Sequence, residues 1–150
     1  PISTRKAPRA GRVRIMLADD HVVMREGLAR LLGSEPDLEV VGEASDGLVA
    51  VDKARRLAPD IILMDLSMPN LNGIEATRII RRDMPETSVI GLSMFEEGER
   101  AQAMLDAGAS AYITKSGPAD ELLALIRSVA AVERGGRRSA APANKRPTRS

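Results

Sequence analysis

At residues 61–65 the sequence IILMD leads four consecutive apolar residues directly into an acid. A continuous apolar run of this length is typical of a strand buried on both faces, as in a parallel sheet. The loop at residues 66–73 (LSMPNLNG) follows at once and places Asp65 at the carboxyl end of that strand. Open α/β sheets hold their ligands and their chemistry at this edge. Asp65 is therefore the candidate centre of the protein's function.

The rest of the chain alternates between strand-like and helix-like patterns. We expect strands at residues 13–18, 38–44, 61–65, 88–92 and 109–114, and helices at residues 21–33, 48–57, 73–84, 96–107 and from 118 to about 132. Strict alternation implies a parallel sheet with right-handed crossovers and helices on both faces. For five strands the common order is 2-1-3-4-5, with its switch point between the first and third strands. The fold class predicted is therefore α/β, flavodoxin-like and doubly wound.

The composition narrows the class of protein further. At 150 residues the chain has room for one ordinary domain, and it contains no Cys, so disulfides and thiolate metal sites are excluded. Phe95 and Tyr112 are the only aromatic residues, so the core must be aliphatic. The sequence shows no long apolar segment and no signal-peptide pattern, which predicts a cytoplasmic protein without membrane insertion.

Charge is distributed unevenly along the chain. Residues 1–14 carry five basic side chains and residues 134–150 carry six, and neither segment contains an acid. The middle of the chain is therefore acidic. We predict a basic flexible leader at residues 1–12, a domain at residues 13–133 and a basic disordered tail at residues 134–150. Solvated linkers are the main interpretation of both ends, and contact with nucleic acid or a partner stays open.

Acids follow two of the expected strands. Asp19 and Asp20 end the first strand and Asp65 ends the third, so all three converge at the switch point. Clustered carboxylates repel one another and tend toward protonation unless a cation is present. A donor set made only of oxygen suits a hard cation such as Mg²⁺. The alternative is that Asp19 and Asp20 only cap the first helix near His21.

Two further polar residues follow the remaining strands of this edge. Lys115 comes directly after the fifth strand and Ser93 directly after the fourth. A carboxylate can act as a nucleophile and form an aspartyl phosphate, and phosphoryl transfer needs charge neutralisation that a lysine can supply. Ser93 could donate a hydrogen bond to an attached phosphoryl group. The alternatives are a surface lysine and a serine without a role.

Taken in order and at these spacings, the residues resemble the signature of response-regulator receiver domains, and the resemblance covers residues 13 to about 132. The matching positions are Asp19-Asp20, Asp65, Met68-Pro69, Gly73, Ser93 and Lys115. The resemblance implies that Asp65 takes a phosphoryl group from a histidine kinase or a phosphotransfer protein. It also implies that Asp20, Asp65 and the carbonyl of Ser67 hold Mg²⁺, with Asp19 assisting.

The same resemblance implies a switch. Ser93 would move to the phosphoryl group and Tyr112 would turn inward behind it, and the fourth helix, fifth strand and fifth helix would present the change. Homodimer formation on phosphorylation is a further expectation. The run Asp19-Asp20-His21 resembles the subclass joined to helix-turn-helix output domains, and similar receivers end hybrid sensor kinases. The start at Pro1 suggests a piece cut from a longer polypeptide.

Two other functions remain as alternatives. An aspartyl-nucleophile phosphohydrolase commonly needs a second acid two residues after the nucleophile, where this chain has Ser67. We therefore expect a phosphoacceptor with slow self-dephosphorylation rather than an enzyme. A DNA-binding regulator needs an output domain, and residues 134–150 lack the length and pattern of a helix-turn-helix. Direct nucleic acid binding by this chain is not expected, and His21 is interpreted as a helix-start residue.

Overall fold

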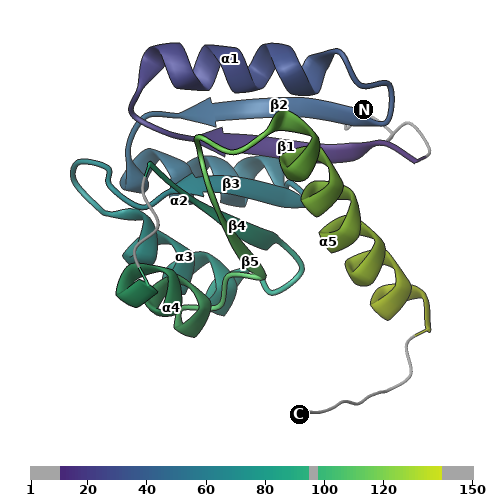
Figure 1. Cartoon of the computed structure of the whole chain (residues 1–150). Helices are drawn as coiled ribbons and strands as arrows, with labels where there is room; N and C mark the ends of the chain where they lie inside the picture. The colour runs from purple at the N-terminus through teal and green to yellow at the C-terminus, as the bar shows by residue number, and fades with distance from the viewer. Residues whose placement is uncertain (1–10, 95–97, 140–150) are drawn as a thin grey trace.

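The computed structural model of the chain describes residues 11–94 and 98–139, with side chains up to Glu133 (Figure 1). Its strands are β1 (Val13–Ala18), β2 (Leu38–Ala44), β3 (Ile61–Asp65), β4 (Ser88–Ser93) and β5 (Ala111–Thr114). Its helices are α1 (Val22–Gly33), α2 (Gly47–Leu57), α3 (Gly73–Asp83), α4 (Gly98–Asp106) and α5 (Ala119–Ser139). The predicted alternation of strands and helices is confirmed.

The five strands form one parallel sheet in the order β2-β1-β3-β4-β5, as predicted. β3 lies at the centre, between β1 and β4, and all five of its residues are buried. Because β1 and β3 are adjacent, their carboxyl ends lie side by side, with Ala18 paired to Met64. This pairing is what brings the acids after β1 next to the acid that ends β3.

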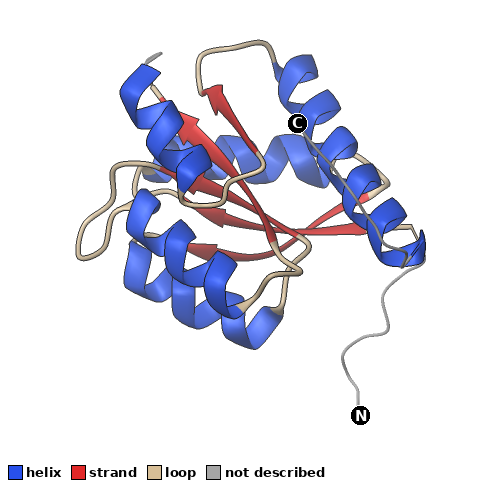
Figure 2. Cartoon of the chain, turned by 90° about the horizontal axis from the view of Figure 1, so that it is seen from below, coloured by secondary structure: helices blue, strands red, loops and turns tan. Residues whose placement is uncertain are grey.

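Each face of the sheet has its own apolar core, and Figure 2 shows helices on both sides. One core joins α1 and α5 to alternate strand residues such as Leu17, Leu63 and Ile90. The other joins α2, α3 and α4 to the intervening residues, such as Met16, Ile62 and Met64. Successive strand side chains point to opposite faces, so covering both faces requires the unbroken apolar runs seen in the sequence. The doubly wound arrangement is confirmed.

Two boundaries differ from the sequence-based expectation by more than one residue, and a third is not tested. β5 begins at Ala111 rather than at residue 109, and Ala109 instead packs into the core of the α2–α3–α4 face. The predicted start of the fourth helix at residue 96 lies outside the described residues. α5 continues over residues 134–139 as helix, past the expected end of the domain at 133. These residues carry Arg134, Arg137 and Arg138, and the apolar pattern that marks the helix stops before them.

Candidate functional site

The side chains at the carboxyl ends of β1, β3 and β5 meet in one cluster. One carboxylate oxygen each from Asp19, Asp20 and Asp65 and a ring nitrogen of His21 all lie within 4.8 Å of one another. Asp19 and Asp65 are buried, whereas Asp20 and His21 are exposed. The structure shows the predicted convergence of the three acids, and Asp20 and His21 form the exposed side of this acid cluster.

Lys115 completes this cluster from the end of β5. Its side chain is 1% exposed, and its Nζ lies 2.8 Å from Asp19 Oδ2 and 3.3 Å from Asp65 Oδ1. The Lys115 amide donates a 2.6 Å hydrogen bond to the carbonyl of Ser93, which fixes the end of β5 against the end of β4. Lys115 is therefore a buried cation held between two carboxylates, and not the surface lysine of the alternative interpretation.

Burial raises the pKa of Asp65 to about 6, from an ordinary value of 3.8. The side chain is removed from water, and that desolvation is the largest cause. The positive charge of Lys115 lowers the pKa, the negative charge of Asp19 raises it, and hydrogen bonds from Lys115 and the Ser67 amide lower it. An added cation would favour the charged form of Asp65 by the same mechanism as Lys115.

Removing the charge of Lys115 is expected to raise the pKa of Asp65 further. Lys115→Met keeps an aliphatic side chain but removes the cation 3.3 Å from Asp65 Oδ1, so only the hydrogen bond from the Ser67 amide still opposes desolvation and the Asp19 charge. A pH titration of the Asp65 carboxyl carbon by NMR, in the presence of a chelator, measures the shift. Lys53→Met is the matched control, because the Lys53 ammonium donates to the carbonyl of Glu43 instead. An Asp65 midpoint unchanged by Lys115→Met would contradict this electrostatic description.

The β3–α3 loop packs closely against the end of β3 that carries Asp65. The Leu66 amide donates to the carbonyl of Leu92, and the Gly73 amide donates to the carbonyl of Leu66. A Cβ on Gly73 would lie 2.0 Å from the carbonyl oxygen of Asp65, so only glycine allows the start of α3 to approach β3 this closely. Asn72 caps α3 by accepting from the amide of Glu75 at 2.9 Å. The loop is thus fixed at both ends.

Ser67 lies in this loop, exposed to solvent. Its amide faces Asp65 Oδ1 at 3.5 Å, and its hydroxyl accepts a 3.1 Å hydrogen bond from the Arg100 guanidinium of α4. The position two residues after Asp65 is therefore tied to α4, a link that the sequence does not reveal.

Ser93 and Tyr112 lie on neighbouring strands. Ser93 ends β4 and is buried, and Tyr112 lies in β5 paired with Gly91. Since Gly91 and Ser93 are two residues apart in β4, and Tyr112 and Thr114 in β5, both candidate switch residues point to the same face of the sheet. Tyr112 is half-buried and packs against the core beneath α4. The structure brings the predicted pair to one face.

His21 is the site residue for which the sequence predicts no role in the acid cluster. It is the N-cap residue of α1, as expected for a helix-start residue, but its ring turns back over the acids. Nδ1 lies 3.1 Å from Asp19 Oδ1, 3.3 Å from Asp20 Oδ1 and 3.8 Å from Asp65 Oδ2. The only sequence signal is its place directly after Asp20.

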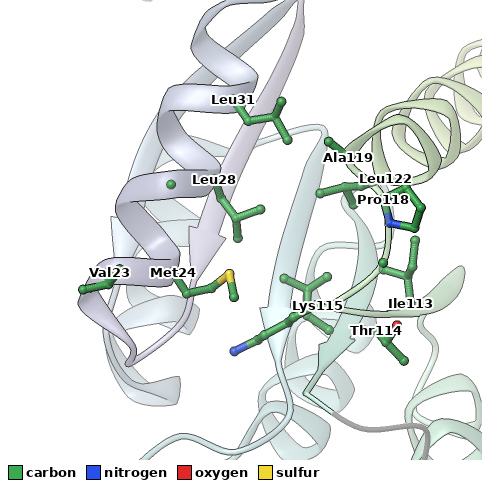
Figure 3. Close-up of a pocket in the computed structure, with 13 residues that line it drawn as sticks. Val23, Met24, Leu28, Leu31, Ile113, Thr114, Lys115, Pro118, Ala119 and Leu122 are labelled. Carbon is green, nitrogen blue, oxygen red and sulfur yellow. The ribbon is translucent and has the colours of Figure 1, made fainter.

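A separate cavity of about 330 Å³ lies beside the acid cluster, between α1 and α5 (Figure 3). Met24, Leu28 and Leu31 reach into it from α1, and Ile113 and Leu122 face them. Lys115 is its charged lining residue, and the Lys115 ammonium is engaged by the acids. Apart from Lys115 and Thr114 the lining of this cavity is apolar, so the acid cluster is the better candidate to hold a phosphoryl group or a hard cation.

The donor set of the acid cluster fits a divalent cation. Asp65 Oδ2 is buried and has no hydrogen-bond partner, which is costly unless another group compensates. Asp19 and Asp20 supply the neighbouring carboxylate oxygens, and such hard oxygen ligands suit Mg²⁺.

Among the helices of the described residues, none is both long and apolar enough to cross a membrane.

Comparison with known proteins gives consistent matches. The family model for the response regulator receiver domain matches residues 15–127. The transcriptional regulatory protein LiaR of Bacillus subtilis is 43% identical over 116 residues, which cover 77% of this chain and 55% of LiaR. The chain spans about half the length of the curated relatives it matches.

Solved structures agree with this match. The chain is 40% identical, with a TM-score of 0.77, to a two-component response regulator of the LuxR family from Aurantimonas sp. SI85-9A1, and the match covers 81% of this chain and 86% of that one. It is 26% identical, with a TM-score of 0.73, to a chain of the CheX–CheY–BeF₃–Mg²⁺ complex from Borrelia burgdorferi, over 78% of this chain and 88% of that one.

Proposed function

The chain belongs to the response regulator receiver domain family, and we propose that Asp65 is the residue that accepts the phosphoryl group. The observation that carries the proposal is the geometry around Asp65. A buried carboxylate has one oxygen near Lys115 and a second oxygen without a hydrogen bond, and two further acids lie within reach. A structural ion pair would need only the lysine and one acid.

The proposed reaction is an in-line displacement. An oxygen of the Asp65 carboxylate attacks the phosphorus of a phosphohistidine, an O–P bond forms, the N–P bond breaks, and the imidazole leaves. The Asp65 carboxylate must be charged to act as a nucleophile. Lys115, 3.3 Å from Asp65 Oδ1, favours that charged form and supplies a positive charge for the phosphoryl oxygens.

Mg²⁺ is the proposed cofactor, held by Asp20, Asp65 and the carbonyl of Ser67, with Asp19 assisting. When bound, Mg²⁺ supplies positive charge to the phosphoryl oxygens as they accumulate negative charge. Asp19 is engaged on both oxygens, by the His21 amide at Oδ1 and by Lys115 at Oδ2, which suits an assisting role. The Borrelia burgdorferi complex holds Mg²⁺ together with BeF₃.

The proposed output is a change of surface. Phosphorylation replaces the single negative charge of the Asp65 carboxylate with a phosphoryl group that carries about −1.5 to −2 charges at neutral pH, enough to attract the Ser93 hydroxyl from the end of β4. Tyr112 would then move inward on the same face of the sheet. The Arg100–Ser67 hydrogen bond joins α4 to the loop that follows Asp65. The surface made by α4, β5 and α5 would therefore respond to phosphorylation.

The proposed partners are a histidine kinase or phosphotransfer protein and, on phosphorylation, a second copy of the chain. We propose residues 13–133 as the receiver domain, with basic segments at residues 1–12 and 134–150. LiaR is a transcriptional regulatory protein, which favours a DNA-binding regulator over a hybrid sensor kinase as the parent. The phosphohydrolase alternative finds no acid at position 67, where the Ser67 hydroxyl instead accepts from Arg100.

The decisive experiment is labelling by a small phosphodonor. Incubation with acetyl phosphate and Mg²⁺ is expected to add one phosphoryl group per chain, detected by intact mass and removed by hydroxylamine. Asp65→Asn or a chelator abolishes the labelling, because each removes a required group. Asp52→Asn is the matched control, since Asp52 is exposed on α2 and pairs with Arg56. Labelling that persists in Asp65→Asn would overturn the proposal, and sustained turnover of a phosphate ester would support the phosphohydrolase.

A further inference from the structure

The ring of His21 occupies an unusual position over the acid cluster. A single nitrogen, Nδ1, faces oxygens of three carboxylates, at 3.1 Å from Asp19, 3.3 Å from Asp20 and 3.8 Å from Asp65. The backbone holds the ring there, because the His21 amide donates to Asp19 Oδ1 at 2.9 Å. Arg25 of α1 adds a 2.5 Å hydrogen bond to the carbonyl of Asp19. The loop that carries the ring is thus anchored to α1.

The ring nitrogen and Lys115 use different oxygens of the same carboxylates. Lys115 contacts Asp19 Oδ2 and Asp65 Oδ1. His21 Nδ1 faces Asp19 Oδ1 and Asp65 Oδ2 instead. The Lys115 ammonium lies 3.4 Å from Nδ1, at the boundary between the two sides. The Lys115 ammonium therefore occupies one side of the cluster, next to Asp19 Oδ2 and Asp65 Oδ1. The other side presents Asp19 Oδ1, Asp65 Oδ2 and His21 Nδ1.

A proton on His21 Nδ1 would not provide hydrogen bonds to all of the carboxylate oxygens that it faces. An imidazole nitrogen offers either one N–H or one lone pair. At 3.8 Å, Asp65 Oδ2 is beyond hydrogen-bond distance from Nδ1, and it is buried without a hydrogen-bond partner. A divalent ion on this side can accept the lone pair of Nδ1 and the carboxylate oxygens at the same time. That arrangement compensates all of these groups.

We propose that His21 Nδ1 is a fourth protein ligand of the divalent-ion site, which makes the site selective for the later first-row transition ions such as Co²⁺ and Ni²⁺. Imidazole suits these ions, whereas Mg²⁺ prefers oxygen ligands. The inference rests on the proposed function only in that both place a divalent ion at this cluster, and it does not depend on phosphoryl transfer. The nitrogen adds affinity for the softer ions and little for Mg²⁺.

The composition makes the nitrogen ligand identifiable. His21 is the only histidine of the chain, and there is no cysteine. Any imidazole nitrogen bound to a metal ion in the untagged protein therefore belongs to His21. Electron spin-echo spectroscopy of bound Mn²⁺ detects such a nitrogen directly. Protein labelled with ¹⁵N only in histidine must then show a coupling different from that of unlabelled protein.

The experiment compares the untagged full chain with His21→Ala and His21→Gln, using Mn²⁺, Co²⁺ and Mg²⁺ alone as probes. We expect nitrogen coupling to Mn²⁺ in the parent chain and its loss in both variants. Calorimetry should show Co²⁺ affinity reduced at least about tenfold, with Mg²⁺ affinity much less changed. Val23→Ala is the control, because Val23 is a neighbour in α1 and is 83% exposed.

Absence of the nitrogen coupling, or equal losses for Co²⁺ and Mg²⁺, would overturn the inference. These results are separable from the proposed function. Labelling of Asp65 in Mg²⁺ without nitrogen coupling would reject His21 as a ligand and leave the phosphoacceptor role intact. Nitrogen coupling together with undiminished labelling of Asp65→Asn would reject the phosphoacceptor role and support the ligand.

Discussion

Replacing Gly73 with alanine is expected to destabilise the fold by about 3 kcal/mol or more. The added Cβ would lie 2.0 Å from the carbonyl oxygen of Asp65, 2.9 Å from its carbonyl carbon and 3.0 Å from the Cα of Leu66. All three are backbone atoms at the end of β3, so no side-chain rotation relieves the overlap. Either α3 or the end of β3 must move, and both hold the acid cluster in place. Typical domains have a total stability of about 5–15 kcal/mol.

Urea unfolding followed by circular dichroism measures this loss, with Gly27→Ala as the matched control. Gly27 lies within α1 and has open space where its Cβ would be. Alanine there should stabilise the protein by about 0.5–1 kcal/mol, through the better helix propensity of alanine. Replacement of glycine by alanine is thus expected to lower the free energy of unfolding at position 73 and to raise it at position 27. Similar effects at both would show that the close approach of α3 to β3 is not a constraint.

Replacing Asp65 with asparagine is expected to stabilise the protein at neutral pH when no divalent ion is present. The pKa of Asp65 is about 6 in the folded state, because the side chain is buried, against 3.8 as the ordinary value. Between these values the folded state binds more protons than the unfolded state, so stability falls as the pH rises. The penalty is absent below the ordinary value and complete above pH 6. At 1.36 kcal/mol per pKa unit it amounts to about 3 kcal/mol.

The measurement is the free energy of unfolding from pH 4 to pH 8 in the presence of a chelator. The parent chain should lose stability between about pH 4 and 6 relative to Asp65→Asn, which has no proton to release at this position. Above that range the variant is the more stable protein. Mg²⁺ should narrow the difference, because it binds the folded parent chain and stabilises it by mass action. Parallel pH profiles for the two proteins would contradict the raised pKa of Asp65.

The two predictions concern the backbone and the side chain of Asp65. Gly73 acts on the backbone carbonyl of Asp65 and sets where the side chain stands. Burial acts on the carboxylate and sets its charge. A residue selected only for stability would not keep a buried acid with an unpaired oxygen, since asparagine would fit the same volume. The cost is consistent with a site that gains its stability when a cation or a phosphoryl group arrives.

The sheet was predictable because the information for it is local. The run at residues 61–64 is apolar at every position, which only a strand covered on both faces tolerates. Proline, glycine and capping residues such as Asn72 mark where each element ends within a few positions of the pattern itself. Once strands and helices alternate, the order of the sheet follows from general rules of connection. The position of Asp65 at a strand end, beside Asp19 and Asp20, was therefore readable from the sequence.

Contacts between distant segments were not readable in this way. No role of His21 in the acid cluster was predicted, because the approach of its ring to Asp65 depends on how the β1–α1 loop folds back. Arg100 contacts Ser67 across 33 positions of the chain, and Lys115 meets His21 across 94. Contacts between residues so far apart in the chain leave no periodic pattern or motif among neighbouring residues. α5 likewise continues over residues 134–139 without the apolar periodicity that marks its earlier turns.

The α/β fold and the strand order follow from the sequence alone, as does the presence of three acids and a lysine at one edge of the sheet. The folded chain is needed to show which oxygen of each acid Lys115 contacts, which oxygen of Asp65 has no hydrogen bond and where the ring of His21 lies. This difference arises from the range of the interactions involved. Backbone pairing and apolar periodicity are set by residues close in the chain, whereas burial, pKa and the direction of a side chain depend on atoms that only the folded chain brings together.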